Sequence, residues 1–406
     1  MKILMLKDYF YPEKCAGINL SLELVSELTK KGFNIEIYTP IPCRGINDDI
    51  RFSYKKRKKE LIYDAVVYRY WLPYEGKSTL IRALRYFLQN FIQIWKGFST
   101  KYDLLFLGST PPTMGLVGAV LKLIKHKPFI YNLQDVFPDS LVTTGITKKG
   151  SLLWVIGSII EKITYSSADK IIVISESFKT NLINKNVPEE KIVVINNWID
   201  TDTVHPVPKA KNSVYDEFDI PKGKYIILYA GNLGNAQGSD VILEAADLLS
   251  EYDDILFVVF GGGSQFEEFK LKAKHRANLL VFGLLPSERV SEVYSLGDIA
   301  LITCKKGTGM SGMPSKTWSI MACNVPIVAS FDTDSDLAKM LNQVGAGVCV
   351  EPENPECLSK AILKQYLNKN ITKCNSREFI INNISKEYCT DAYIREFSRI
   401  INTRER

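Results

Sequence analysis

Residues 225–238 read Tyr-Ile-Ile-Leu-Tyr-Ala-Gly-Asn-Leu-Gly-Asn-Ala-Gln-Gly, an unbroken apolar run that passes into a glycine-rich loop. An apolar run of this length, ended by glycine, predicts a strand buried on both faces. A helix is expected directly after it, at about 238–250. A strand, a glycine-rich turn and a helix in this order are typical of a doubly wound sheet.

The same alternation extends in both directions along the chain. Downstream, further strands are expected at 256–260, 280–282, 299–302, 327–329 and 347–350. Upstream, strands are expected at 2–6, 33–37, 65–70, 103–107, 129–133, 170–174 and 192–195. Helical segments lie between them. The sequence therefore predicts an α/β fold with two Rossmann-like, doubly wound domains that face each other across a cleft.

The domain boundary is expected near His205-Pro206-Val207-Pro208, because two prolines in a polar stretch are typical of a linker. We expect an N-terminal domain at 1–200, a linker at 201–212 and a C-terminal domain at 213–375. A polar helical segment at 376–406 is expected to cross back to the first domain. Ligands of such sheets bind at the carboxyl ends of the strands.

Composition narrows the classes of protein. The net charge of +6 over 406 residues suits anionic diphosphates or an acidic membrane surface, but it falls short of a nucleic-acid-binding footprint. The chain begins with a predicted strand and has no run of 18 apolar residues, so we expect a cytoplasmic protein without a signal peptide. Its eight cysteines form no C-x-x-C pair and its three histidines are scattered, so no metal site is expected.

Three loops have the composition of a phosphate-binding site. Gly17 stands directly before a predicted helix, Asn232 and Gln237 follow the first strand quoted above, and Gly262 ends the next strand. Glycines permit close approach of a ligand, and N–H groups at the start of a helix bind phosphate. The signatures G-x-G-x-x-G and G-x-x-x-x-G-K-[ST] are absent, which argues against NAD and against ATP in a P-loop.

The segment 308–330 passes from a glycine-rich loop into a short helix and then into a buried strand. Its first part reads Thr-Gly-Met-Ser-Gly-Met-Pro-Ser-Lys-Thr-Trp-Ser-Ile-Met-Ala. Lys316 falls in the first turn of this helix, where a cation opposes the helix dipole. We therefore expect an anion such as phosphate beside Lys316.

These segments together resemble family 4 of the retaining glycosyltransferases, which have the two-domain fold called GT-B. Pro12 and Gly17 match the family's N-terminal loop, and 197–200 is similar to its Asn-Gly-x-Asp linker. The loop after Gly231 and the segment Pro-Ser-Lys-x-x-x-x-Met-Ala resemble the branch that contains L-fucosamine transferases of surface-polysaccharide assembly. The resemblance implies a nucleotide-sugar donor, with UDP favoured over GDP, and chemistry that needs no metal.

The resemblance also implies the roles of individual residues. It places the donor at Gly17, Asn232, Gln237, Gly262, Ser311, Gly312, Met313, Pro314, Ser315, Lys316 and Ser319. Lys316 would stabilise the leaving diphosphate. Ser311 and Ser319 stand where most of the family carries two glutamates, and a serine hydroxyl holds ribose hydroxyls more weakly than a carboxylate does. Asn232 and Gln237 stand where the family has an arginine and a lysine.

Two aspartates are the candidates on the acceptor side. The segment 132–140 resembles the branch's Asp-x-Trp-Pro-Glu/Asp-Ser sequence. Asp135 would orient or deprotonate the acceptor hydroxyl, and Asp139 would lie beside it. The alternative role for Asp139 is to cap the helix that follows.

Residues 80–98 predict an amphipathic helix with basic flanks. Leu84, Phe87, Leu88, Phe91 and Trp95 recur at helical spacing. A helix facing the core is the favoured interpretation, and a helix lying in a membrane interface is the alternative. The basic run from Arg51 to Lys59 is expected to be a solvated loop, although it could also meet anionic lipid.

The expected function is transfer of an N-acetylated hexose or deoxyhexose from a UDP-sugar to a saccharide acceptor on a lipid diphosphate. Such a step belongs to O-antigen or capsule assembly and would take place at the inner membrane. Two alternatives stay open. One is a UDP-sugar 2-epimerase on the same fold, and the other is a catalytically silent subunit that binds nucleotide sugars. Turnover by the purified chain separates the transferase from the silent subunit.

Overall fold

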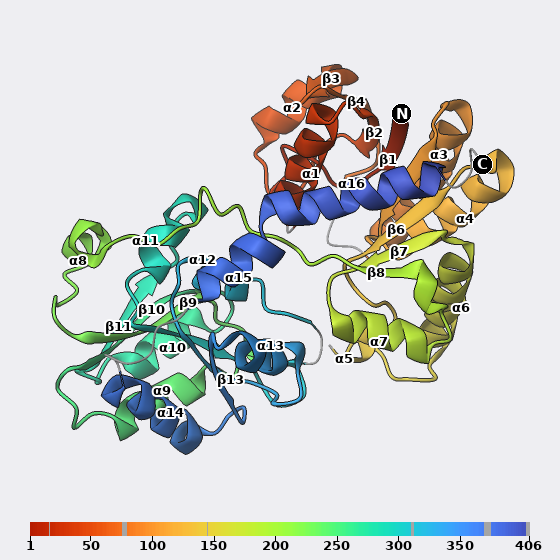
Figure 1. The fold of residues 1–406 in the computed structure, drawn as a ribbon. Coiled ribbons are helices and arrows are strands. Elements are labelled where there is room, and N and C mark those ends of the chain that lie inside the picture. The colour runs from red at the N-terminus through yellow and green to blue at the C-terminus, as the bar shows by residue number, and fades with distance from the viewer. Residues whose placement is uncertain (16, 75–78, 144, 310–311, 369–374, 403–406) are drawn as a thin grey trace. The chain divides into compact units, whose positions relative to one another are not determined.

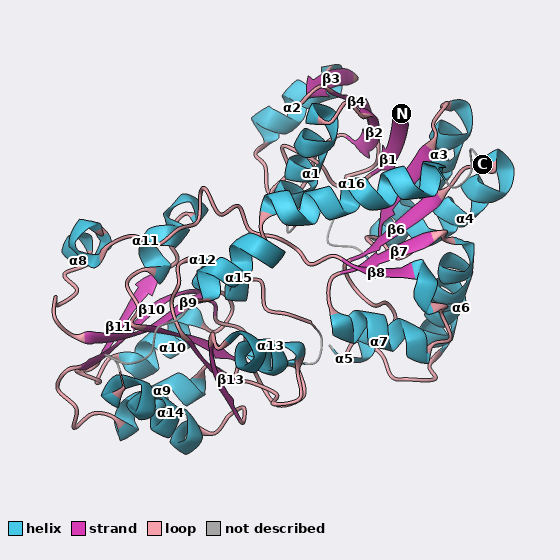
Figure 2. Cartoon of the chain, viewed as in Figure 1, coloured by secondary structure: helices cyan, strands magenta, loops and turns pink. Residues whose placement is uncertain are grey.

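The computed structural model describes the chain except for residues 16, 75–78, 144, 310–311, 369–374 and 403–406. The chain forms two compact units (Figure 1). Unit 1 comprises Met1–Asn196 and Cys389–Arg406, and unit 2 comprises Asn197–Tyr388. Each unit is a sheet covered by helices on both faces (Figure 2).

The sheet of unit 1 has the strand order β3-β4-β2-β1-β5-β6-β7-β8. Its strands are β1 Lys2–Leu6, β2 Asn34–Pro40, β3 Lys59–Ile62, β4 Ala65–Tyr70, β5 Leu104–Gly108, β6 Phe129–Leu133, β7 Lys170–Val173 and β8 Ile192–Val194. All neighbours pair in parallel except β3 and β4. The strand order reverses at β1, which creates the switch point where such sheets bind ligands.

Helices cover both faces of this sheet. They are α1 Ile18–Lys30, α2 Asp48–Lys56, α3 Thr79–Ser99, α4 Met114–Lys125, α5 Asp139–Thr143, α6 Leu152–Ser167, α7 Glu176–Asn184 and α16 Lys386–Asn402. Alternate side chains of a strand point to opposite faces. Leu105 and Leu107 accordingly share a core with Val117 of α4, whereas Phe106 contacts Phe397 of α16 at 5.1 Å between ring centroids.

Two predictions for unit 1 were wrong. The basic run from Arg51 to Lys59 is not a loop: it forms most of α2 and the first residue of β3, although its lysines are exposed to solvent as expected. Asn47 caps α2 by accepting a hydrogen bond from Ile50 N–H, which explains why a polar stretch begins a helix here. The favoured core-facing interpretation of 80–98 is also wrong for most of the predicted stripe, because Leu84, Phe87, Phe91 and Trp95 are exposed. Leu88 is half-buried, and Ile94 packs against the core of unit 1.

The sheet of unit 2 is entirely parallel, with the order β11-β10-β9-β12-β13-β14. Its strands are β9 Tyr225–Asn232, β10 Ile255–Gly262, β11 Leu279–Gly283, β12 Ile299–Thr303, β13 Ile327–Ser330 and β14 Gly347–Val350. Its helices are α8 Val214–Glu217, α9 Asp240–Leu248, α10 Phe266–Ala273, α11 Val290–Tyr294, α12 Lys316–Ala322, α13 Asp336–Val344, α14 Pro355–Leu367 and α15 Ser376–Asn383.

The segment expected as a linker, 201–212, belongs to unit 2. His205 N–H donates to Ser291 Oγ at 3.1 Å, and Val207 N–H donates to Ser295 Oγ at 2.9 Å, so the segment lies against α11. Helix α16 begins in unit 2 and continues into unit 1. None of the helices in the described part of the chain is both long and apolar enough to cross a membrane.

Candidate donor and acceptor sites

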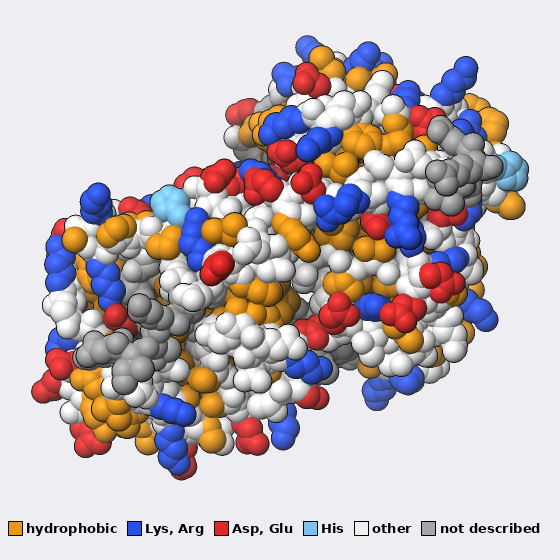
Figure 3. Space-filling model, in the orientation of Figure 1, with side chains coloured by type: hydrophobic (Ala, Val, Ile, Leu, Met, Phe, Trp, Pro, Cys, Tyr) orange, Lys and Arg blue, Asp and Glu red, His pale blue; other side chains and the backbone are white. Residues whose placement is uncertain are grey.

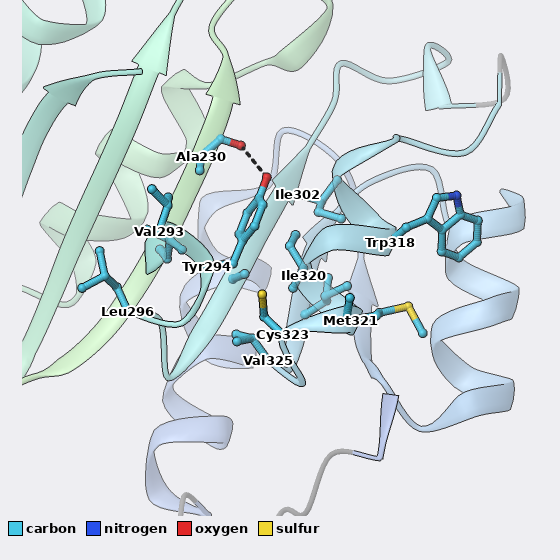
Figure 4. Close-up of a cluster of buried hydrophobic side chains, with 14 of the residues drawn as sticks. Ala230, Val293, Tyr294, Leu296, Ile302, Trp318, Ile320, Met321, Cys323 and Val325 are labelled. Carbon is cyan, nitrogen blue, oxygen red and sulfur yellow. Dashed lines mark hydrogen bonds between the residues drawn. The ribbon is translucent and has the colours of Figure 1, made fainter. Parts of the chain in front are cut away.

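The candidate donor site lies at the carboxyl edge of the sheet of unit 2, where β9, β10 and β12 end and α12 begins. A buried apolar cluster holds α12 at this edge (Figure 4). Trp318, Ile320 and Met321 of α12 belong to the same cluster as Tyr294 of α11. The Tyr294 hydroxyl donates to the Ala230 carbonyl of β9 at 3.4 Å, which ties α11 to the end of β9.

Lys316 extends from the first turn of α12 onto β9. Its Nζ lies 4.0 Å from the centroid of the Tyr229 ring, a cation–π distance. Loss of water around the ammonium lowers the pKa of Lys316 from 10.5 to about 7. No carboxylate in the described part of the chain forms an ion pair with it, so its positive charge has no partner there to offset the lost hydration.

Gly231 makes room for this ammonium. Its φ is 140°, in the region that side chains avoid. A Cβ on Gly231 would lie 2.8 Å from Lys316 Nζ. Glycine at 231 therefore permits both the backbone conformation at the end of β9 and the position that Lys316 Nζ occupies.

Asn232 and Gln237, which were predicted to bind the donor, form a hydrogen bond with each other. Gln237 Oε1 accepts hydrogen bonds from Asn232 Nδ2 at 3.2 Å and from Gly234 N–H at 3.1 Å. The neighbouring loop is joined to them, because Leu233 N–H donates to the Gly262 carbonyl at 2.6 Å. These contacts fix the shape of the loops after β9 and β10. A direct contact of Asn232 or Gln237 with a donor stays a prediction.

Asp332, two residues after the end of β13, holds the candidate donor loop, and the sequence analysis did not single it out. Its side chain is buried, and its two oxygens accept hydrogen bonds from Gly307 N–H at 2.9 Å and from Gly309 N–H at 2.8 Å. It thereby shapes the loop that leads to α12. An acidic residue two positions after a buried strand was the available signal.

The remaining predicted donor residues lie on this loop and on α12. Gly312 has a φ of 135°, Ser315 precedes α12 without making a side-chain cap, and Ser319 lies partly exposed on α12. Met313 packs against the core cluster, and the Pro314 carbonyl accepts from Thr317 N–H at 3.0 Å. Ser311 falls outside the described residues.

In unit 1, the loop after β1 leads to Gly17. Gly17 has a φ of 79° and precedes α1 without a side-chain cap. Glu13 fixes this loop from inside. Its Oε1 accepts from Cys43 N–H at 2.8 Å, and its Oε2 accepts from Phe10 N–H at 3.1 Å. The Ile18 N–H at the start of α1 also donates to the Cys15 carbonyl of this loop, at 3.3 Å.

The two candidate aspartates of unit 1 have different surroundings. Asp135 is exposed and accepts a hydrogen bond from Ser140 Oγ at 3.0 Å. Asp139, the first residue of α5, forms an ion pair with Lys185 at 2.9 Å and accepts from Asn181 Nδ2 at 3.1 Å. The geometry leaves Asp135 as the more accessible carboxylate, whereas Asp139 joins α5 to α7.

A buried polar cluster lies between α3 and the carboxyl edge of the unit 1 sheet, and the sequence reasoning missed it. Gln93 Nε2 donates to the Tyr70 hydroxyl at 3.0 Å and to the Lys7 carbonyl at 3.1 Å. Gln89 is fully buried, and neither polar atom of its amide has a partner among the described residues. Unpaired buried amides are costly, so such a group suits a polar ligand. The sequence signal for this cluster was the recurrence of polar residues every four positions, at Arg85, Gln89 and Gln93, in an otherwise apolar predicted helix.

Comparison with known proteins gives matches over most of the chain. A family model described as "Glycosyltransferase Family 4" matches residues 19–203, and one described as "Glycosyl transferases group 1" matches residues 212–387. The probable glycosyltransferase WbjE of Pseudomonas aeruginosa is 28% identical over 300 residues, which cover 71% of this chain and 73% of that protein.

Two further matches extend over nearly the full length. The putative colanic acid biosynthesis glycosyl transferase WcaI of Escherichia coli K12 is 25% identical, over 98% of this chain and 99% of that protein. The crystal structure of Anabaena Alr3699/HepE in complex with UDP superposes with a TM-score of 0.71 at 14% identity, over 98% of this chain and 100% of that one. The predicted α/β fold with two Rossmann-like domains is thereby confirmed.

Proposed function

This chain belongs to family 4 of the glycosyltransferases, a retaining family, and we propose that it transfers a sugar from a UDP-sugar to a saccharide carried on a lipid diphosphate. The proposed sugar is an N-acetylated hexose or deoxyhexose, and the proposed setting is assembly of a surface polysaccharide such as O-antigen or capsule. The name of the WcaI relative supports that setting. The motifs after Gly231 and around Lys316 support a place in the L-fucosamine transferase branch.

The main support for the proposal is the ammonium group of Lys316, which has no carboxylate partner in the described part of the chain. It lies over Tyr229 at the carboxyl edge of the sheet, with a pKa lowered to about 7 by burial. Desolvating a charge without a partner is unfavourable, and a bound diphosphate would remove that cost. The UDP held by Anabaena HepE, which has the same fold, supports a uridine diphosphate as that anion.

The proposed chemistry divides between the two units. Lys316 and nearby backbone N–H groups stabilise the negative charge that develops on the departing diphosphate. Asp135 accepts the proton of the acceptor hydroxyl, which attacks from the face that the diphosphate leaves. Gln89 and Gln93 hydrogen-bond hydroxyls of the acceptor saccharide. No metal ion is required, because the lysine supplies the positive charge.

Calorimetric titration with UDP, GDP, dTDP and CMP tests the donor class. We expect clear preference for UDP and a roughly 10²–10³-fold weaker affinity in Lys316→Ala, because a charged contact of this kind contributes about 2–4 kcal/mol. The matched control is Lys360→Ala, which removes a lysine from the exposed surface of α14. Preference for another nucleotide would refute the UDP donor. UDP binding without turnover would favour the silent subunit.

A further inference from the structure

Helix α3 exposes large apolar side chains and buries polar ones, although Ile94 of the same helix packs against the core of unit 1. Among the α3 side chains that the structure describes, the large exposed ones are apolar: Ile81, Leu84, Phe87, Phe91, Trp95 and Phe98. Phe87 is 71% exposed, Phe91 66% and Trp95 62%. The face turned toward the sheet instead carries Arg85, Gln89 and Gln93, all buried. A helix in water buries its apolar stripe, so this arrangement indicates that something apolar covers α3.

The apolar surface continues onto two neighbouring helices. Gly97 of α3 lies against Leu121 of α4, and Gly115 of α4 lies against Thr164 of α6, so closely that neither glycine has room for a Cβ. The three helices therefore pack side by side in one layer (Figure 1). On α4 and α6 the exposed apolar residues are Val120, Leu123, Ile124, Leu152, Leu153, Val155, Ile156, Ile159 and Ile163. In Figure 3, apolar side chains reach the surface beside α3 and α4.

Positive charge accompanies this layer, which we call the α3–α4–α6 face. The stretch 79–167, from the start of α3 to the end of α6, contains ten lysines and arginines and four acidic residues, and its net charge of +6 equals that of the whole chain. Lys125 Nζ donates to the Phe98 carbonyl at 2.9 Å and lies 5.7 Å from the centroid of the Phe98 ring. Lys127 and Lys162 are exposed. Cationic side chains thus border the apolar residues.

We propose that the α3–α4–α6 face docks onto an anionic lipid bilayer, with α3 lying in the interface. Apolar side chains would enter the acyl boundary, Trp95 would lie at the level of the headgroups, and the lysines would meet lipid phosphates. This inference extends the proposed function. Only one part of it depends on that function: a lipid-linked acceptor in the docked membrane would reach Gln89 and Gln93 on the inner side of α3. The docking itself requires neither donor nor acceptor.

Flotation with vesicles tests the proposal without any substrate. The wild-type chain should float with vesicles of equal parts phosphatidylglycerol and phosphatidylcholine, and should float less with phosphatidylcholine alone or at high salt. The variant Phe87→Ser/Phe91→Ser/Trp95→Ser should lose roughly tenfold in partition coefficient for each side chain, because each one removes much of its transfer free energy. The control Leu248→Ser/Leu271→Ser/Leu367→Ser deletes three exposed leucines of unit 2 and should float like wild type.

Three outcomes overturn the proposal. They are absence of the wild-type chain from the floating fraction, equal flotation of the α3 variant, and equal loss in the leucine control. A dimer seen by light scattering that the α3 variant dissociates, without flotation, would assign the face to a second copy of the chain. UDP titration of the α3 variant separates the two proposals, because unchanged affinity with lost flotation leaves the transferase assignment intact.

Discussion

The lowered pKa of Lys316 makes the affinity for UDP depend on pH in a defined direction. In the free folded chain this pKa is about 7, against 10.5 for an ordinary lysine. A bound diphosphate favours the ammonium form and raises the pKa again. Affinity should therefore be nearly constant below pH 7 and fall by up to tenfold per pH unit above it, because binding must then restore a proton.

The size of the effect follows from the fraction of Lys316 that is protonated. Between pH 7.5 and pH 9 that fraction falls roughly 20-fold for a pKa near 7, and the affinity should fall in proportion. The diphosphate of UDP is fully ionised across this range, since its last phosphate pKa is about 6. The pH dependence of folding stability has the opposite sign to that of UDP affinity. Between pH 7 and 10.5 the unfolded chain keeps a proton that the folded chain has lost, so this group makes stability rise with pH. The deprotonation of Lys316 therefore does not unfold the chain as pH rises, and a loss of UDP affinity above pH 7 cannot be attributed to it through unfolding.

Calorimetry in buffers of different ionisation enthalpy measures the proton directly. At pH 8 the wild-type chain and the Lys360→Ala control should take up close to one proton per UDP bound. Lys316→Ala should take up almost none, and its weakened affinity should not vary with pH. Equal proton uptake by wild type and Lys316→Ala, or a wild-type affinity that is flat from pH 7.5 to pH 9, would refute the reasoning.

Three further predictions concern other residues of the two sites. Gly231→Ala should lower the free energy of unfolding by about 1–3 kcal/mol and weaken UDP binding, because a methyl group at a φ of 140° is strained and occupies the space of Lys316 Nζ; unchanged denaturation and titration curves would contradict this. Asp135→Asn should lower kcat roughly 10²–10⁴-fold at unchanged stability, whereas Asp139→Asn should cost up to about 1 kcal/mol of stability by breaking its lysine pair. Identical profiles for the two aspartate variants would remove their separate roles. Gln89→Leu should leave stability unchanged or raised, because the amide atoms have no partners among the described residues, while the acceptor KM rises and the UDP affinity stays constant. A destabilised variant would show that the amide is satisfied within the fold.

The sequence predicted the parallel strands well because each is a short apolar run ended by glycine or a polar residue. The run from Tyr225 to Ala230 became β9, and every strand of unit 2 lies at or beside its expected position. β3 was missed, because Lys59 and Glu60 give this edge strand the composition of a loop. The enzyme class was also predicted correctly, from the resemblance of the loops and not from the fold, since many functions share this fold.

The spacing of apolar residues in α3 could not show whether its apolar stripe faces the core or the surface. A pattern of apolar residues identifies a stripe but not what covers it, so the core-facing interpretation was favoured and proved wrong. The polar residues Gln89 and Gln93 on the opposite stripe point to the sheet, and only the structure shows that they are buried there. Asp332 was missed for a similar reason, because its bonds to Gly307 and Gly309 join loops that are far apart in the sequence. The roles of Lys316 and Asp135 stay predictions.

The central claim is that this chain transfers a sugar from a UDP-sugar with retention of configuration, and a transfer assay tests it most directly. Purified protein would be incubated with UDP-N-acetylated hexoses or deoxyhexoses and a polyprenyl-diphosphate-linked saccharide, in the presence and absence of EDTA. We expect one UDP released per glycoside formed, an anomeric configuration in the product identical to that of the donor, and no effect of EDTA. Inverted configuration, or no glycoside formed from any UDP-sugar that binds, would contradict the account.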